Sequence, residues 1–151
     1  MPIDVTVQFA GDWPGLPGEQ DINRWVEAAL GERHDAELTV RVVGRAESRR
    51  LNRSFRGKDR ATNVLSFPSD LPEAVELPLL GDIVVCAPLV AEEATAQGKP
   101  MAAHWAHLVI HGVLHLLGYD HELEAEALDM ESKEIEILKT LGISDPYLEK
   151  T

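Results

Sequence analysis

Apolar and polar residues alternate in two stretches of the chain, as they do in half-buried strands. These stretches are Ile3–Phe9 and Ala36–Val43. A third segment, Leu79–Cys86, has an apolar run long enough for a central strand. Asn63–Phe67 has the pattern of a short strand that Pro68 ends. The pattern therefore predicts about four strands.

Helical spacing of apolar residues predicts about five helices between and after these strands. They are expected over Asp21–Leu30, Arg45–Phe55, Pro88–Gln97, Met101–Leu117 and Glu122–Leu141, with an acidic, proline-rich loop over Asp70–Pro78. The resulting order, β-α-β-α-β-β-α-α-α, alternates only in part. We therefore expect an α/β fold with α+β character, in which helices pack on one mixed sheet. The length suits a single domain over residues 1–151.

The composition indicates a globular protein without an intramolecular disulfide. The chain has 44% hydrophobic and 26% charged residues, which is ordinary for a globular protein. Cys86 is the single cysteine, so no intramolecular disulfide can form. The N-terminal residues lack the pattern of a signal peptide, and no apolar stretch approaches the ~20 residues that span a bilayer. We expect a cytoplasmic protein with no membrane partner.

The net charge of −12 conceals a basic window. Residues 41–60 hold eight of the fourteen basic residues and only two acidic ones, a local charge of +6. The basic residues are Arg41, Arg45, Arg49, Arg50, Arg53, Arg56, Lys58 and Arg60. A basic patch on an acidic body can hold a polyanion, although such a cluster can also be a solvated helix face.

The segment HGVLHLLGYDH carries the candidate chemistry. His111 and His115 are four residues apart and share one helical face, within reach of one metal ion. A third ligand further along a straight helix would be too distant, so the chain has to turn. Gly118 stands where it can take a positive φ and end the helix, which lets His121 return to the ion. Three protein ligands leave a fourth position open, as in catalytic zinc sites.

The histidine spacing also resembles that of metzincin metallopeptidases, whose motif is His-Glu-x-x-His-x-x-Gly-x-x-His. Position 112 holds glycine where a metzincin has the glutamate that acts as general base. We interpret His104 and His107, on the same predicted helix, as structural residues. A zinc metallopeptidase-like hydrolase remains an alternative that Gly112 disfavours.

Three motifs together resemble the YbeY family of bacterial endoribonucleases. They are HGVLHLLGYDH, FRGKDRATNVLSFP over Phe55–Pro68, and LGDIVV over Leu80–Val85. Ala61 departs from the family, which often has proline there. The resemblance implies a zinc-dependent, single-strand-preferring endoribonuclease that acts in ribosomal RNA processing, including maturation of the small-subunit (16S) 3′ end, and in ribosome quality control. Ribosomal or small-subunit assembly proteins are the partners it implies.

The resemblance also assigns residues. It implies that His111, His115 and His121 bind one Zn²⁺, with Arg56 in the catalytic cleft. We interpret Arg56 and His111 as catalytic, and Arg56, Lys58, Arg53 and Arg49 as RNA-binding. Asp82 and Asp120 are candidates to hydrogen-bond a ligand histidine, although each can instead have a structural role.

Two questions stay open at this point. The nucleophile that attacks the phosphorus is either water or the RNA 2′-OH. The sequence does not decide between them, because it offers no obvious general base. A non-catalytic, RNA-binding ribosome-assembly factor with a structural zinc is the remaining alternative.

Overall fold

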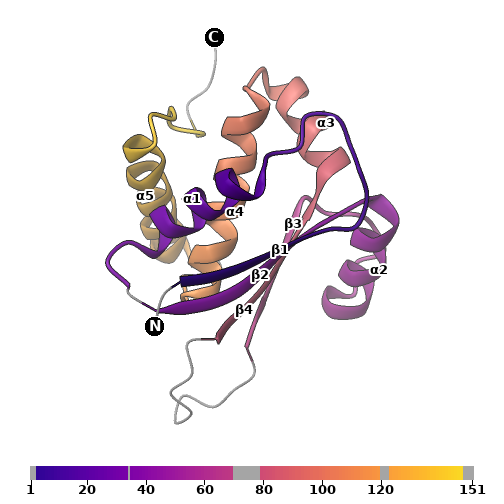
Figure 1. The fold of residues 1–151 in the computed structure, drawn as a ribbon, viewed down its shortest axis with the longest axis horizontal. Helices are drawn as coiled ribbons and strands as arrows, with labels where there is room; N and C mark the ends of the chain where they lie inside the picture. Colours follow the sequence, from indigo (N-terminus) through magenta and orange to yellow (C-terminus); the bar gives the residue numbers. More distant parts are fainter. Residues whose placement is uncertain (1–2, 34, 70–78, 120–122, 148–151) are drawn as a thin grey trace.

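A mixed four-stranded sheet lies at the centre of the protein (Figure 1), which is described by a computed structural model. The structure describes residues 3–33, 35–69, 79–119 and 123–147. The strands are β1 (Ile3–Phe9), β2 (Ala36–Val43), β3 (Val64–Pro68) and β4 (Leu79–Cys86), in the spatial order β1-β2-β4-β3. β2 is parallel to both β1 and β4, and β3 is antiparallel to β4. The predicted mixed sheet and the central place of β4 are confirmed.

The five predicted helices are present in the predicted order. They are α1 (Glu19–Leu30), α2 (Arg45–Arg56), α3 (Ala87–Gln97), α4 (Met101–Leu116) and α5 (Glu124–Thr140). The largest difference at a described boundary is the start of α1, two residues before the predicted Asp21. The Asp21 carboxylate accepts a hydrogen bond from the Gly18 N–H at 3.2 Å, so Asp21 is the third helical residue rather than the first. The predicted loop over Asp70–Pro78 lies outside the described residues.

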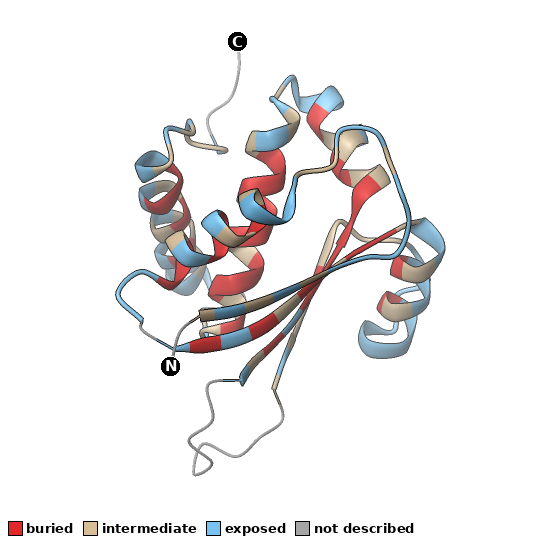
Figure 2. Ribbon diagram, in the orientation of Figure 1, coloured by how far each residue is buried: buried red, intermediate tan, exposed pale blue. Residues whose placement is uncertain are grey.

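The two faces of the sheet are covered unequally. α1, α4 and α5 lie on one face, where α4 is the central helix, and α2 lies on the other (Figure 1). The main core fills the space between the sheet and α4, with Val40, Ile83, Val85 and Ile110 fully buried. A smaller apolar cluster under α2 holds Val84 and its neighbours. Figure 2 shows the difference, because α4 is largely buried and α2 is largely exposed.

Helix α4 approaches the sheet very closely at Gly112. A Cβ atom built on Gly112 would lie 2.9 Å from Cγ2 of Ile83 on β4. The Ser66 hydroxyl on β3 donates a hydrogen bond to the Gly112 carbonyl at 3.2 Å. Glycine at this position therefore lets α4 lie against β4 and β3, which places the following turns of α4 at the β3 edge.

Helices in the described part of the chain are too short or too polar to cross a membrane.

The pairing of β3 with β4 depends on Gly81. Gly81 has a φ of 137°, and a Cβ there would lie 2.1 Å from the Phe67 carbonyl oxygen. We predict that Gly81→Ala lowers the free energy of unfolding by about 3 kcal/mol or more, because backbone strain and a backbone clash add together. Urea denaturation measures this loss.

Gly98→Ala is the matched control, since Gly98 also has a positive φ but meets nothing within 4 Å of its added Cβ. We expect it to cost only about 1–2 kcal/mol. Equal losses for the two variants would contradict the close approach of β3 to β4.

Candidate metal centre

Helix α4 brings the first two predicted metal ligands together. The Nε2 atoms of His111 and His115 lie 3.1 Å apart, one helical turn from each other. Both side chains are half-buried near the C-terminal end of α4. Two imidazole nitrogens that face each other at this distance can bind one ion after small side-chain rotations.

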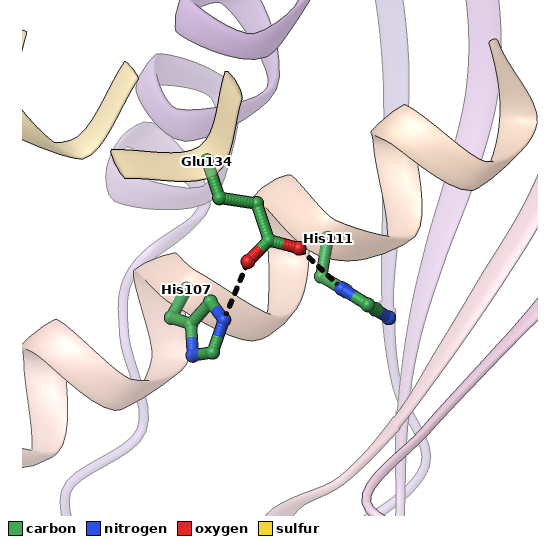
Figure 3. Close-up of side chains that lie close together, drawn as sticks. All are labelled: His107, His111 and Glu134. Atoms are coloured by element: carbon green, nitrogen blue, oxygen red, sulfur yellow. Dashed lines mark hydrogen bonds and ion pairs between the residues drawn. The ribbon is translucent and has the colours of Figure 1, made fainter. Parts of the chain in front are cut away.

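A buried carboxylate holds His111 from the other side. Glu134 on α5 is 0% exposed, and its Oε1 accepts a hydrogen bond from His111 Nδ1. Its Oε2 contacts His107 Nε2 at 2.9 Å and accepts a hydrogen bond from the Tyr147 hydroxyl. Figure 3 shows the carboxylate pointing from α5 between the two histidines of α4. Glu134 was not among the predicted site residues, because its position on a helix with many acidic residues does not distinguish it.

The hydrogen bonds keep Glu134 ionised. Burial alone would raise the pKa of Glu134, but hydrogen bonds from His107, His111 and Tyr147 outweigh it and lower that pKa from 4.5 to about 2. Burial and the neighbouring Glu134 charge raise the pKa of Tyr147 well above its usual range. Tyr147 therefore stays protonated and remains a hydrogen-bond donor to Glu134.

This arrangement fixes which His111 nitrogen is available to a metal. Because the carboxylate accepts from Nδ1, that nitrogen carries the hydrogen, and Nε2 presents its lone pair toward His115. A carboxylate that orients a metal-binding histidine through its other nitrogen is a recurrent feature of protein metal sites. The donor set at the two Nε2 atoms therefore fits a divalent transition metal.

The described residues also offer a second ligand set. Ligand atoms of His107, His111 and Glu134 all lie within 4.8 Å of one another. Both oxygens of Glu134 already accept hydrogen bonds in this group, and binding an ion there would displace those hydrogens. The hydrogen-bonded arrangement favours Glu134 as a support for His111 rather than as a ligand.

The predicted third ligand, His121, lies outside the described residues, as does Asp120. The turn that precedes them is described. The N–H of Gly118 bonds to the His115 carbonyl, and the N–H of Tyr119 bonds to the Leu114 carbonyl, both at 3.0 Å. Gly118 has a φ of 104°, as predicted for a glycine that ends the helix.

A cleft of about 870 Å³ joins the histidines to the basic window. His111, His115 and Arg56 line it together, with β3 as its floor. The other lining residues are Phe55, Thr62, Asn63, Val64, Leu65, Ser66, Phe67, Pro68, Gly118 and Tyr119. The described part of this wall contains no Asp or Glu, so the cleft suits an anionic ligand.

Arg56 is held in place by the end of α2. It is the last residue of α2, and Gly57 ends the helix in the left-handed conformation. Two buried polar residues of α2 fasten the loop that follows. Ser48 Oγ contacts the Thr62 carbonyl and N–H at 2.8 and 2.9 Å, and Asn52 Nδ2 donates to the Arg60 carbonyl at 2.8 Å. The wall that carries Arg56 is therefore well supported.

The other predicted RNA-binding residues lie outside the cleft wall. Arg53 and Lys58 are exposed, and neither lines the cleft. The Arg49 guanidinium binds both oxygens of Asp59, at 2.7 and 3.0 Å. Arg41 and Arg45 are paired with Glu47 and Glu92. Arg56, by contrast, forms no ion pair within the described residues.

The prediction that Asp82 supports a ligand histidine is wrong. Asp82 is exposed, and side chains alternate along β4. Its neighbour Ile83 faces Gly112 on α4, so Asp82 projects from the opposite face of the sheet. Glu134 fills the predicted supporting role instead.

The Glu134 network generates a pH-dependent prediction. A depressed pKa adds stability above the unfolded value of about 4.5, and that stability disappears as pH falls toward the folded value of about 2. Wild type should therefore exceed Glu134→Gln in unfolding free energy most clearly above pH 4.5. The difference should shrink by roughly 3 kcal/mol by pH 2. Urea denaturation with a chelator present measures it.

Glu136→Gln is the control, because Glu136 is exposed on the same helix. Its difference from wild type should stay small at every pH. A Glu134→Gln difference that does not change between pH 5 and pH 2 would rule out an ionised, hydrogen-bonded Glu134.

Comparison with known proteins identifies the family of this chain. A model of the endoribonuclease YbeY family matches residues 17–142. Endoribonuclease YbeY from Stenotrophomonas maltophilia (strain R551-3) is 55% identical over 150 residues, which cover 96% of this chain and 93% of the relative. The solution structure of TM1509 from Thermotoga maritima is 29% identical, with a TM-score of 0.58, and the match covers 95% of this chain and 100% of that one. The chain therefore belongs to the endoribonuclease YbeY family.

Proposed function

We propose that this protein cleaves RNA phosphodiester bonds in the cleft between α2 and α4. The observation that carries the proposal is the placement of Arg56 with His111 and His115 on the wall of one cleft. Arg56 comes from a different motif than the two histidines, and it lies 55 positions before His111 in the chain. The name of the Stenotrophomonas relative, endoribonuclease, supports the same activity.

We propose that His111 and His115 hold a Zn²⁺ through Nε2, with His121 as the third ligand. Imidazole ligands suit zinc, and the arrangement of the two Nε2 atoms supports this choice. The metal supplies a Lewis acid that polarises a phosphoryl oxygen and stabilises the charge of the transition state. Glu134 keeps the hydrogen of His111 on Nδ1, and its negative charge favours a cation nearby.

Arg56 has a separate role in this proposal. Its guanidinium is permanently charged and can donate two parallel hydrogen bonds to the non-bridging oxygens of a phosphate. The absence of carboxylates from the described cleft wall favours this contact, because no fixed negative charge there repels the RNA backbone. Arg56 therefore positions the scissile phosphate and stabilises its added charge.

The substrate we propose is single-stranded ribosomal RNA, including the 3′ end of the small-subunit RNA, with ribosomal assembly proteins as partners. The proposal rests on the family and on the basic surface of α2. Arg53 and Lys58 are exposed beside the cleft and can follow the RNA backbone beyond the scissile phosphate. Arg49 would have to leave Asp59 to do the same.

The geometry disfavours the peptidase alternative. A metzincin uses a glutamate at the position of Gly112 as its base. Here that position is buried against Ile83, where even a methyl group would collide. A longer acidic side chain at 112 could not enter the cleft without moving α4 away from the sheet.

Metal content tests the ligand assignment. We predict that wild-type protein binds about one Zn²⁺ per chain, and that His111→Ala or His115→Ala lowers the affinity by more than ~100-fold, because each loses a coordinate bond. Elemental analysis after dialysis measures this. His104→Gln is the control, since His104 lies on the same helix but bonds to Glu93. Equal metal content in all four proteins would refute the assignment.

Arg56→Ala tests the cleavage proposal. We predict a roughly 100-fold fall in kcat/KM on single-stranded RNA, the scale expected when one donor to transition-state charge is removed. Arg45→Ala makes the same charge change on the same helix, where Arg45 pairs with Glu92 instead, and should retain nearly full activity. RNA that is bound but never cleaved faster than by metal-stripped protein would favour the non-catalytic assembly factor.

A further inference from the structure

A large aromatic side chain stands exposed at the mouth of the cleft. Phe55 is 67% exposed, more than any other large hydrophobic residue in the described part of the chain. It directly precedes Arg56 at the end of α2, and both residues line the cleft. Single exposed apolar residues are common on protein surfaces, but Phe55 lies on the wall of a cleft, where a ligand can cover it.

Phe67 holds the Phe55 ring in a defined orientation. The two ring centroids are 4.7 Å apart, and the ring planes make an angle of 62° in an edge-to-face contact. Phe67 lies on β3 and packs against the small apolar cluster under α2, so it is itself anchored. Phe67 therefore fixes the orientation of the Phe55 ring, and most of the Phe55 side chain remains exposed at the cleft.

We propose that Phe55 is a stacking platform for an unpaired nucleobase of the substrate. The proposal rests on the proposed RNA cleavage and adds a base-binding subsite to it. If Arg56 binds a phosphate of the RNA, the nucleoside attached to that phosphate would lie next to Phe55. Stacking on an aromatic side chain needs a base whose face is open, and bases within a duplex already stack on each other. Phe55 therefore selects single-stranded RNA with little preference for sequence.

The surroundings favour a nucleobase over an apolar protein surface. Arg53, Arg56 and Lys58 lie close to Phe55 along the chain, and all three are exposed. An aromatic ring among cations is typical of sites that bind single-stranded nucleic acid, where the cations contact phosphates and the ring contacts bases. A protein interface would expose a broader apolar patch with charge at its rim.

The direct test measures binding of a fluorescent single-stranded RNA 12-mer by anisotropy, with wild-type holoprotein and three variants at Phe55 or Phe9. Phe55→Leu keeps an apolar side chain but removes the aromatic face. We expect it to raise Kd by roughly 10- to 100-fold, the scale for losing one stacked base. Phe9→Leu makes the same change at another exposed phenylalanine, outside the cleft, and should leave Kd unchanged.

A set of 12-mers with one abasic nucleotide at successive positions locates the stacked base. One abasic position should weaken binding to wild type but have no further effect on Phe55→Leu, whereas duplex RNA should bind both proteins equally.

Phe55→Tyr keeps the aromatic ring and should bind RNA like wild type. This variant tests the proposal if Phe55→Leu does not fold. Wild-type affinity in Phe55→Leu, or weakened binding in Phe55→Tyr, would overturn the stacking proposal. A wild type that neither binds nor cleaves RNA would instead refute the proposed function.

Discussion

The candidate site depends on one interaction, the hydrogen bond between the buried Glu134 carboxylate and Nδ1 of His111. A carboxylate that is 0% exposed is costly unless donors surround it, and His107, His111 and Tyr147 meet that need. The same contacts set the tautomer of His111, because a hydrogen on Nδ1 leaves the lone pair on Nε2, the nitrogen that faces His115. The charge of Glu134 therefore both stabilises the contact between α4 and α5 and sets which nitrogen of His111 carries the hydrogen.

The second constraint is the close packing that forms the cleft. Gly112 lets α4 lie against Ile83, and β3 is the edge strand between the histidines of α4 and the end of α2. Arg56 and Phe55 come to this edge because α2 ends there and its following loop is tied back through Ser48 and Asn52. The residues that we propose bind phosphate and base therefore lie on α2, and those that we propose bind the metal lie on α4, around one cleft.

Much of this architecture could be predicted from the sequence, because hydrophobic periodicity is a local signal. β1, β2 and β4 have the predicted boundaries, and the sheet is mixed as expected. The i, i+4 spacing of His111 and His115 also fixes their contact within one helix. Glu134 could not be found this way, because nothing local distinguishes it from the exposed acidic residues of α5. The sequence also could not place Asp82. Its side chain points away from the histidines because the opposite face of β4 packs on α4, and the sequence does not show which face that is.

The most direct test of this account is a crystal structure of the zinc-loaded protein with anomalous data at the zinc edge. The account predicts one strong peak within coordination distance of the Nε2 atoms of both His111 and His115, with Glu134 still hydrogen-bonded to His111 Nδ1. A peak inside the triangle of His107, His111 and Glu134, bonded to the carboxylate, would contradict it, because Glu134 would then be a ligand and His111 would bind through Nδ1.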